Sequence, residues 1–262
     1  MGHSFTPLPD GSTTLTDTAN GQAMHSRVGS WQEANQVYVG PSGLTQRQDP
    51  AILWDVGMGT ASNALAALEG STCLLEIWSF ENDLNGIRTA LGRTDLFPWL
   101  NRHSNLVQEL LERGVVHLPG GRGRWHLLEG DFRREISRAP GPDFVFWDFY
   151  SPGVVPDLWS LEIFQDLAQR LSPESLWISY AAATSVRAAL LLSGFHVGRG
   201  ASTRAKSETT VASLSRNRVT QPLGKEWLGK IERSSRLMPH GYSGTREDLR
   251  AQLVRTNHFS VY

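Results

Sequence analysis

From residue 51 onwards, the sequence alternates short β-type runs with helical patterns. Apolar runs such as AILWDV (51–56) and FVFWDF (144–149) are separated by segments such as DLWSLEIFQDLAQRL (157–171), where apolar residues recur every three or four positions. Parallel strands need long crossover connections, and helices usually supply them. The alternation therefore predicts a doubly wound, Rossmann-like α/β domain.

About seven strands are expected in this domain, which we place at residues 51–213. Residues 1–50 form a turn-rich amino-terminal extension or lid with one expected strand, NQVYVG (35–40). Residues 214–262 lack strand alternation and are expected to form a mostly irregular or short-helical, basic carboxy-terminal appendage. The expected strands of the domain are 51–56, 74–80, 125–130, 144–149, 175–181, 195–200 and 208–214, and the expected helices are 63–70, 83–92, 105–114, 157–171 and 184–193.

Charge is distributed unevenly along the chain, although the formal net charge is only -1. Residues 1–98 contain four Lys and Arg against ten Asp and Glu, whereas residues 199–236 contain nine against three. Such asymmetry is typical of a surface that binds a polyanion, but a solvated basic tail gives the same count. If the polyanion is RNA, the expected contacts are Arg216, Arg218, Lys225 and Lys230.

No apolar run approaches the roughly 20 residues that a membrane-spanning helix needs, and the first residues lack the apolar stretch of a secretory signal. We therefore expect a cytoplasmic protein with no membrane partner. The single cysteine, Cys73, lies in an apolar run and is expected in the core. It excludes an intrachain disulfide and a multi-cysteine zinc site, and no metal is expected.

The segment WDVGMGTASN (54–63) places Gly57 and Gly59 at a strand-to-helix turn. Ligands of doubly wound sheets bind beyond the carboxyl ends of the strands. Because glycine has no side chain, these two residues let a ligand approach the backbone and the unpaired N–H groups of the next helix. Ser62 stands where a dinucleotide fingerprint has its third glycine, which disfavours a pyrophosphate site. The segment therefore either binds another nucleotide-like cofactor or forms an ordinary strand-to-helix turn without a ligand.

Acidic residues follow the ends of the next strands. Glu81 comes 22 residues after Gly59, about where an acid binds the two hydroxyls of a ribose, and Asp131 and Asp148 end the next two expected strands. The alternative is that these acids only solvate strand ends. Together with the glycine turn, the set resembles the S-adenosylmethionine-dependent methyltransferase fold. This resemblance implies Glu81 on the ribose, Asp131 beside the adenine and Asp148 near the reacting centre.

A narrower resemblance lies in DFVFWDFYSPGVVPDLW (143–159). It is similar to a strand and turn of the bacterial tRNA 5-methylaminomethyl-2-thiouridine methyltransferases, the MnmC amino-terminal domain and its stand-alone MnmD relatives. The family pattern is approximately D-x-x-x-x-D-x-F-x-P, followed by N-P-x-x-W. The matching residues are Asp148, Tyr150 and Pro152 in the turn, and Pro156 and Trp159 in the later element.

The family's glycine turn, G-x-G-T-G-x-N, is matched at Gly57, Gly59, Thr60 and Asn63, with Ala61 in place of the third glycine. Residues 11–39 are similar to the family's amino-terminal signature, and the matching residues there are His25, Ser26, Gly29 and Glu33. The resemblance runs over roughly residues 10–213, and we expect the stand-alone type, without a flavin-binding oxidase domain.

The resemblance implies a class I methyltransferase that methylates the 5-aminomethyl group of the wobble (2-thio)uridine in the anticodon loop of a tRNA. The implied cofactor is S-adenosyl-L-methionine. The residues expected to contact it are Asp55, Gly57, Gly59, Thr60, Asn63, Glu81, Asp131 and Asp148.

A primary amine attacks a sulfonium methyl group only as the free base, so the site needs a group that orients the amine and a route for its proton. Asp148 is the expected orienting group or proton acceptor, and Tyr150 the second catalytic residue. Phe149 and Tyr150 are expected to flank the uracil ring, although a core position is the alternative for Phe149. His25 is either a proton acceptor or a structural residue of a lid. The expected substrate contacts are His25, Ser26, Phe149, Ser151 and Pro152.

Two other functions stay open at this point. An enzyme of the same fold acts on a small-molecule amine or carboxylate, or transfers an aminopropyl group as spermidine synthases do, and it does not need the basic segment. A methyltransferase-like domain without activity serves as an RNA-binding or assembly module. The presence of Glu81 and Asp148 argues against this second alternative.

Overall fold

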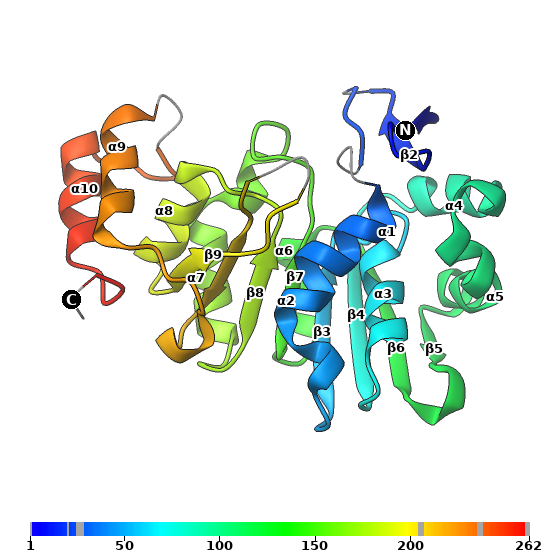
Figure 1. The fold of residues 1–262 in the computed structure, drawn as a ribbon. Coiled ribbons are helices and arrows are strands. Elements are labelled where there is room, and N and C mark those ends of the chain that lie inside the picture. The colour runs from blue at the N-terminus through cyan, green and yellow to red at the C-terminus, as the bar shows by residue number, and fades with distance from the viewer. Residues whose placement is uncertain (1, 20, 25–28, 204–206, 235–237, 260–262) are drawn as a thin grey trace.

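The computed structural model describes residues 2–19, 21–24, 29–203, 207–234 and 238–259. Its centre is an eight-stranded sheet with the strand order β5-β6-β4-β3-β7-β8-β10-β9 (Figure 1). The strands from β6 to β8 run parallel, whereas β5 and β10 are antiparallel to their neighbours. The strands are β3 (Ala51–Val56), β4 (Leu75–Glu81), β5 (Val115–His117), β6 (Gly123–Glu129), β7 (Phe144–Trp147), β8 (Leu176–Ser179), β9 (His196–Arg199) and β10 (Thr210–Ser213).

Helices cover both faces of this sheet (Figure 1). One buried apolar cluster contains residues of α3, α4 and α5, and the other contains residues of α6 to α10. The helices are α1 (Ser30–Glu33), α2 (Gly40–Ser42), α3 (Ser62–Gly70), α4 (Asn85–Leu91), α5 (Pro98–Arg113), α6 (Phe132–Glu135), α7 (Leu161–Arg170), α8 (Thr184–Leu192), α9 (Gly229–Arg233) and α10 (Arg246–Val254). No helix among these described residues is long and apolar enough to cross a membrane.

The chain order reverses beside β3. After β3, the chain adds β4 and β6 on one side of the sheet, and later adds β7 and β8 on the other side. Ligands of such sheets bind at this switch point, beyond the carboxyl ends of the strands. The predicted doubly wound α/β fold is therefore confirmed, and the glycine turn after β3 lies at the switch point.

The strand expected at residues 35–40 is wrong, because this segment is helical. Residues Ala34–Val39 form a π-helical stretch between α1 and α2. Ala34, Val37 and Tyr38 are buried in the cluster that also contains α3. These residues are three and four positions apart, which is the spacing of one helix face. The valines favour a strand by propensity, but burial of this face decides the structure.

The structure contains three strands that the sequence patterns did not predict. β1 (His3–Pro7) and β2 (Thr13–Asp17) form an antiparallel pair, and β5 adds a short edge strand beside β6. The turn between β1 and β2 contains Asp10 and Gly11, and Gly11 has φ 85°. An Asp-Gly pair between β-type runs is a hairpin signal that the sequence already carried. β5 has only one buried residue, Val116, so its pattern gave little signal.

The carboxy-terminal residues pack on the domain through α9 and α10, which lie beyond α8 (Figure 1). His258 is buried, accepts a hydrogen bond from the Val197 N–H (3.3 Å) and donates one to the Leu223 carbonyl (2.8 Å). Burial lowers the pKa of His258 to about 4, so the ring is neutral at pH 7. The short-helical character expected for this appendage is confirmed, and a neutral histidine anchors it.

Candidate active site

The turn after β3 requires glycine at position 57. Gly57 has φ 85°, and its N–H donates to the Phe80 carbonyl (3.0 Å). A Cβ atom on Gly57 would lie 2.6 Å from the carbonyl oxygen of Asp148. No real side chain tolerates such a contact with a backbone atom. The absence of a side chain therefore lets the end of β3 pass directly beside the end of β7.

Ala61, which replaces the third glycine of the family pattern, takes the left-handed conformation with φ 60°. Its N–H donates to the Met58 carbonyl (2.7 Å), and its side chain is buried. A left-handed residue with a Cβ atom costs about 1–2 kcal/mol. The turn thus has a conformation that glycine adopts freely, and alanine holds it with some strain.

Glu81 lies at the end of β4 and faces the glycine turn. Its carboxylate accepts hydrogen bonds from the N–H groups of Gly59 (3.0 Å), Asn82 (2.9 Å) and Asp83 (3.1 Å). Burial raises the pKa of Glu81, although these three donors counteract the shift. Glu81 therefore holds the glycine turn in place, a structural role that its position in the sequence did not reveal.

A cavity of about 270 Å³ lies beside Glu81 at the carboxyl end of the sheet. Phe80, Phe132 and Phe149 line it with apolar surface, and Glu81 and Asp131 add carboxylates. Apolar walls with a few placed polar groups are typical of sites that bind a flat ligand. The cavity is thus lined by the expected ribose-binding acid, Glu81, whose carboxylate also contacts the glycine turn through Gly59.

Asp131 caps the short helix α6. Its carboxylate accepts from the backbone N–H of Arg133 (3.0 Å) and pairs with the Arg133 guanidinium. This guanidinium lowers the pKa of Asp131. Because Asp131 also lines the cavity, its expected place beside the adenine stays a prediction alongside this capping role.

Asp148 lies where β7, α3 and the amino-terminal extension meet. Its carboxylate accepts from the Asn63 side-chain amide (2.8 Å), and the Tyr38 hydroxyl is within hydrogen-bonding reach. Burial raises the pKa of Asp148 to about 8, and the charge of Glu33 adds to this rise. The sequence singled out Asp148 and Asn63 but gave Tyr38 no role.

Three buried polar atoms near the glycine turn have no hydrogen-bond partner among the described residues: Thr60 Oγ1, Asn63 Oδ1 and Asp55 Oδ1. Asp55 lies within the sheet, where the Ser79 hydroxyl donates to its other oxygen (2.7 Å) and burial raises its pKa to about 7. Buried polar atoms without partners are uncommon in native proteins. Those of Thr60 and Asn63, at the turn itself, are candidates for binding a ligand.

The turn after β7 is fixed by two hydrogen bonds from other elements. The Tyr180 hydroxyl donates to the Phe149 carbonyl (3.0 Å), and the Trp159 indole donates to the Tyr150 carbonyl (2.9 Å). The Phe149 ring packs edge-on against Trp147, with ring centroids 5.2 Å apart, which fits the core alternative for Phe149. The Tyr150 hydroxyl is buried and has no partner among the described residues.

The amino-terminal extension touches the same turn. The Gln22 amide lies 3.3 Å from the Ser151 hydroxyl, and Pro152 beside it is half-buried. His25 and Ser26, both expected as substrate contacts, lie outside the described residues. The contact between Gln22 and Ser151 joins segments that are 129 residues apart, so no local pattern predicts it.

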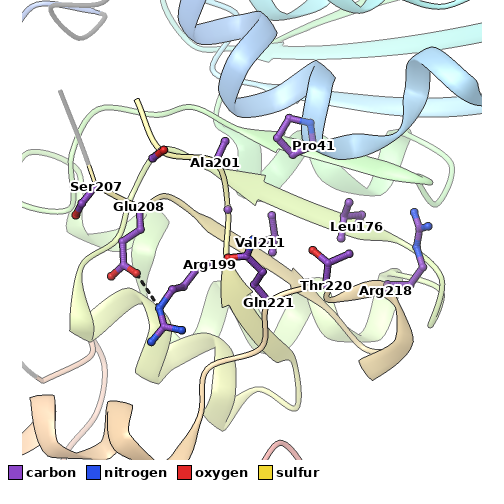
Figure 2. Close-up of a pocket in the computed structure, with 12 residues that line it drawn as sticks. Pro41, Leu176, Arg199, Ala201, Ser207, Glu208, Val211, Arg218, Thr220 and Gln221 are labelled. Atoms are coloured by element: carbon purple, nitrogen blue, oxygen red, sulfur yellow. Dashed lines mark ion pairs between the residues drawn. The ribbon is translucent and has the colours of Figure 1, made fainter. Parts of the chain in front are cut away.

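A second, open cavity of about 570 Å³ lies over β8, β9 and β10, away from the glycine turn (Figure 2). Arg199 points at Glu208 on its rim (3.1 Å), and Arg218 lines its other end. Among the expected RNA contacts, Lys230 pairs with Glu208 (3.2 Å) and Arg216 donates to the His258 carbonyl (3.2 Å). Lys230 thus connects the appendage to the domain, whereas Arg216 joins the two ends of the appendage.

Comparison with known proteins adds to this geometry. Residues 100–215 match a family model described as S-adenosyl-L-methionine-dependent methyltransferase. The tRNA 5-methylaminomethyl-2-thiouridine biosynthesis bifunctional protein MnmC of Cupriavidus necator is 28% identical over 242 residues, covering 84% of this chain and 36% of MnmC. An uncharacterised protein of Methanocaldococcus jannaschii is 27% identical over 222 residues, covering 82% of this chain and 60% of that protein. The chain therefore spans less than two thirds of either relative.

Among solved structures, that of MnmC2 from Aquifex aeolicus matches with a TM-score of 0.74 and 27% sequence identity. The match covers 97% of this chain and 84% of MnmC2, so it includes the amino-terminal extension and the appendage as well as the sheet. The sequence match and the structural match both point to MnmC proteins. The chain is thus similar to MnmC proteins over most of its length, and its residues 100–215 match the S-adenosyl-L-methionine-dependent methyltransferase family model.

Proposed function

We propose that this enzyme methylates the 5-aminomethyl group of a wobble uridine in tRNA. The observation that carries the proposal is Asp148, a carboxylate at the end of β7 that accepts a hydrogen bond from the Asn63 amide (2.8 Å) beside the glycine turn. The tRNA substrate is supported by relatives named for 5-methylaminomethyl-2-thiouridine biosynthesis.

The residues around the glycine turn fit S-adenosyl-L-methionine. We assign the buried Thr60 and Asn63 oxygens to the amino acid part, Glu81 to the ribose hydroxyls and the aromatic cavity to the adenine. Gly57 keeps the backbone open at this place. When bound, the cofactor supplies a methyl group on a positively charged sulfur.

The chain's own residues prepare the amine. Burial raises the pKa of Asp148 to about 8, so its ionised form, which prevails above pH 8, is basic enough to take a proton from the substrate ammonium group. The neutral nitrogen then bonds to the methyl carbon as the carbon–sulfur bond breaks, and the product is a secondary ammonium group. We assign the role of orienting the substrate to the Tyr150 hydroxyl, which is buried and has no partner among the described residues.

Replacing Glu81 by glutamine is expected to weaken S-adenosyl-L-methionine binding by about 10- to 100-fold, because charge-assisted hydrogen bonds to the ribose become neutral ones. Isothermal titration calorimetry measures this change. Glu76→Gln is a matched control on the same strand, where the carboxylate pairs with Arg124 (3.3 Å). Equal affinities for wild type and Glu81→Gln would remove the ribose assignment.

Replacing Arg216, Arg218, Lys225 and Lys230 together by glutamine is expected to weaken tRNA binding and flatten its salt dependence. Each cation that neutralises a phosphate contributes roughly one unit to the slope of log K against log salt. Since Arg216, Arg218 and Lys230 also bind protein groups, we expect a loss of fewer than about four units. The measurement is filter binding at several salt concentrations.

A control for this variant is Arg113→Gln with Arg170→Gln, which removes two surface cations paired within α5 and α7. It should leave the salt slope unchanged. If the quadruple variant binds tRNA with the wild-type slope, the basic segment does not contact the phosphates.

The proposed function is tested by mass spectrometry of nucleosides from tRNA carrying 5-aminomethyluridine, after incubation with the protein and methyl-labelled cofactor. We expect the label in 5-methylaminomethyluridine. Label on a free polyamine, with none on the tRNA, would instead favour the small-molecule transferase.

A further inference from the structure

The open cavity of about 570 Å³ over β8, β9 and β10 has an apolar floor between two arginines (Figure 2). Leu176 and Val211 form the floor, and Pro41 of α2 lies across from them. Arg199 and Arg218 stand on opposite sides of this floor. Cavities of roughly 300–1,000 Å³ with apolar walls and a few polar groups are typical of ligand sites. The size and lining therefore fit one flat organic group that carries a negative charge.

Arg199 is held in place by an ion-pair network centred on Glu208. Arg187 has no exposed surface, and its guanidinium donates to the Thr210 hydroxyl (3.0 Å) and pairs with Glu208 (2.8 Å). Glu208 also pairs with Arg199 Nε (3.1 Å) and with Lys230 (3.2 Å). Three cations thus share one carboxylate, and Arg199 is oriented before any ligand binds.

The other partners of the two arginines are exposed carboxylates. Arg199 Nη2 lies 3.3 Å from Glu226. Arg218 Nε donates to the Glu174 carbonyl (3.1 Å) and lies 4.0 Å from the Glu174 carboxylate. The Glu226 and Glu174 side chains are 68% and 73% exposed, and surface pairs of this kind contribute little to stability. A phosphate can therefore replace either carboxylate at small cost, while Glu208 continues to hold Arg199.

Positive charge exceeds negative charge among the described residues that line the cavity or pair with a charged lining residue. The cations are Arg187, Arg199, Arg218 and Lys230, and the carboxylates are Glu174, Glu208 and Glu226. Only Glu208 among these carboxylates lines the cavity. Arg204 and Lys206 lie outside the described residues. The charge of the lining thus favours an anion.

The Arg199 end of the cavity lies at the same edge of the sheet as Asp148. Asp148 follows β7, and the next strands in the sheet are β8, β10 and β9. Ser179 at the end of β8 pairs with Thr210, which pairs with Arg199. Three strand spacings separate β7 from β9, which is about 14 Å in a sheet. An RNA loop with its wobble uridine at Asp148 can therefore reach the cavity with a nearby nucleotide.

We propose that this cavity binds one unpaired nucleotide near the wobble uridine of the tRNA, with its phosphate at Arg199 and its base on the apolar floor toward Arg218. This inference rests on the proposed function, because it takes tRNA as the substrate. Proteins bind single-stranded bases by stacking them on flat groups, including guanidinium groups, and by hydrogen bonds to the base edges. Thr220 and Gln221, which also line the cavity, supply a hydroxyl and an amide for such bonds.

The test places a carboxylate in the cavity. In Gln221→Glu, the new charge repels a phosphate and competes with it for the arginines. We expect the Kd for an unmodified anticodon stem-loop RNA, measured by filter binding, to rise about tenfold or more. The matched control is Gln108→Glu on α5, which packs near the opposite edge of the sheet (Figure 1) and should bind the RNA as the wild type does. Thr220→Glu, at an exposed lining residue, serves as a second variant if Gln221→Glu does not fold.

A second measurement locates the bound nucleotide. A photoreactive thiouridine is placed at one position of the RNA loop at a time, and the crosslinked peptides are identified by mass spectrometry. We expect a position near the wobble uridine to crosslink to residues 199–202 or 218–221. Crosslinks to other segments only, from every loop position, would overturn the inference. An equal loss of affinity in Gln108→Glu would also overturn it, because the effect would then be one of overall charge.

The two proposals fail in different ways. If Gln221→Glu weakens stem-loop binding and the loop crosslinks to the cavity, the site stands even if amine-bearing tRNA is not methylated. If that tRNA is methylated but Gln221→Glu binds the stem-loop with the wild-type Kd, the proposed function stands and the cavity is not the nucleotide site. A wild-type protein that does not bind the stem-loop would overturn the nucleotide site.

Discussion

Replacement of Gly57 by valine is expected to lower the affinity for S-adenosyl-L-methionine by more than about 100-fold. Two effects act together. The new Cβ atom meets the Asp148 carbonyl oxygen at 2.6 Å, and a β-branched residue at φ 85° is strongly disfavoured. Relief of the clash requires the ends of β3 and β7 to separate, which displaces the turn proposed to hold the cofactor. Calorimetry measures the affinity, and circular dichroism measures the folded fraction.

The matched control is Gly114→Val at the end of α5. Gly114 also has a left-handed backbone, with φ 72°, but a Cβ atom there meets nothing within 4 Å. This variant carries the backbone strain without the clash, and it should lose stability while keeping its cofactor affinity. A folded Gly57→Val variant with wild-type affinity would show that the cofactor does not lie against this turn.

The second large effect is expected for Asp148→Asn, which should lower the rate of methyl transfer by about 100-fold or more. The amide retains the shape of the side chain and its contact with Asn63, but it accepts no proton from the amine. Single-turnover experiments with saturating cofactor isolate this step from cofactor binding.

The stability of Asp148→Asn separates catalysis from folding. Because the folded protein raises the pKa of Asp148 to about 8, the ionised form destabilises the fold at pH values above the unfolded pKa of about 4. This penalty grows until the pH passes about 8, so the variant should unfold at the same or a higher temperature than wild type at pH 8. A variant that is stable and methylates at nearly the wild-type rate would show that another group prepares the amine.

The acids at strand ends were predictable because their position follows from local patterns. The apolar runs that end at Val56, Phe80 and Trp147 mark buried strands, and parallel strands bring their carboxyl ends to one edge. Glu81 and Asp148 are therefore close to the glycine turn in any doubly wound arrangement. The fold and this half of the candidate site required no knowledge of long-range packing.

The contribution of the amino-terminal extension was not predictable in the same way. Tyr38 reaches Asp148 across 110 positions of the chain, and Gln22 reaches Ser151 across 129. Such contacts depend on how a helix docks on the sheet, which hydrophobic periodicity does not specify. The strand wrongly expected at residues 35–40 increased the difficulty, since a strand would turn Tyr38 and Glu33 to different faces.

The close approach of Gly57 to the Asp148 carbonyl has a consequence for how this enzyme can change during evolution. The backbone of the glycine turn and the backbone that carries Asp148, the proposed proton acceptor, are in direct contact, with no side chain between them. A mutation that moves the backbone of either segment is expected to move the other, so a substitution that shifts the backbone at Asp148 also disturbs the glycine turn. Changes in substrate choice are then expected mainly in segments that contact Gly57 and Asp148 without forming this backbone contact, such as the amino-terminal extension and the loop after β7.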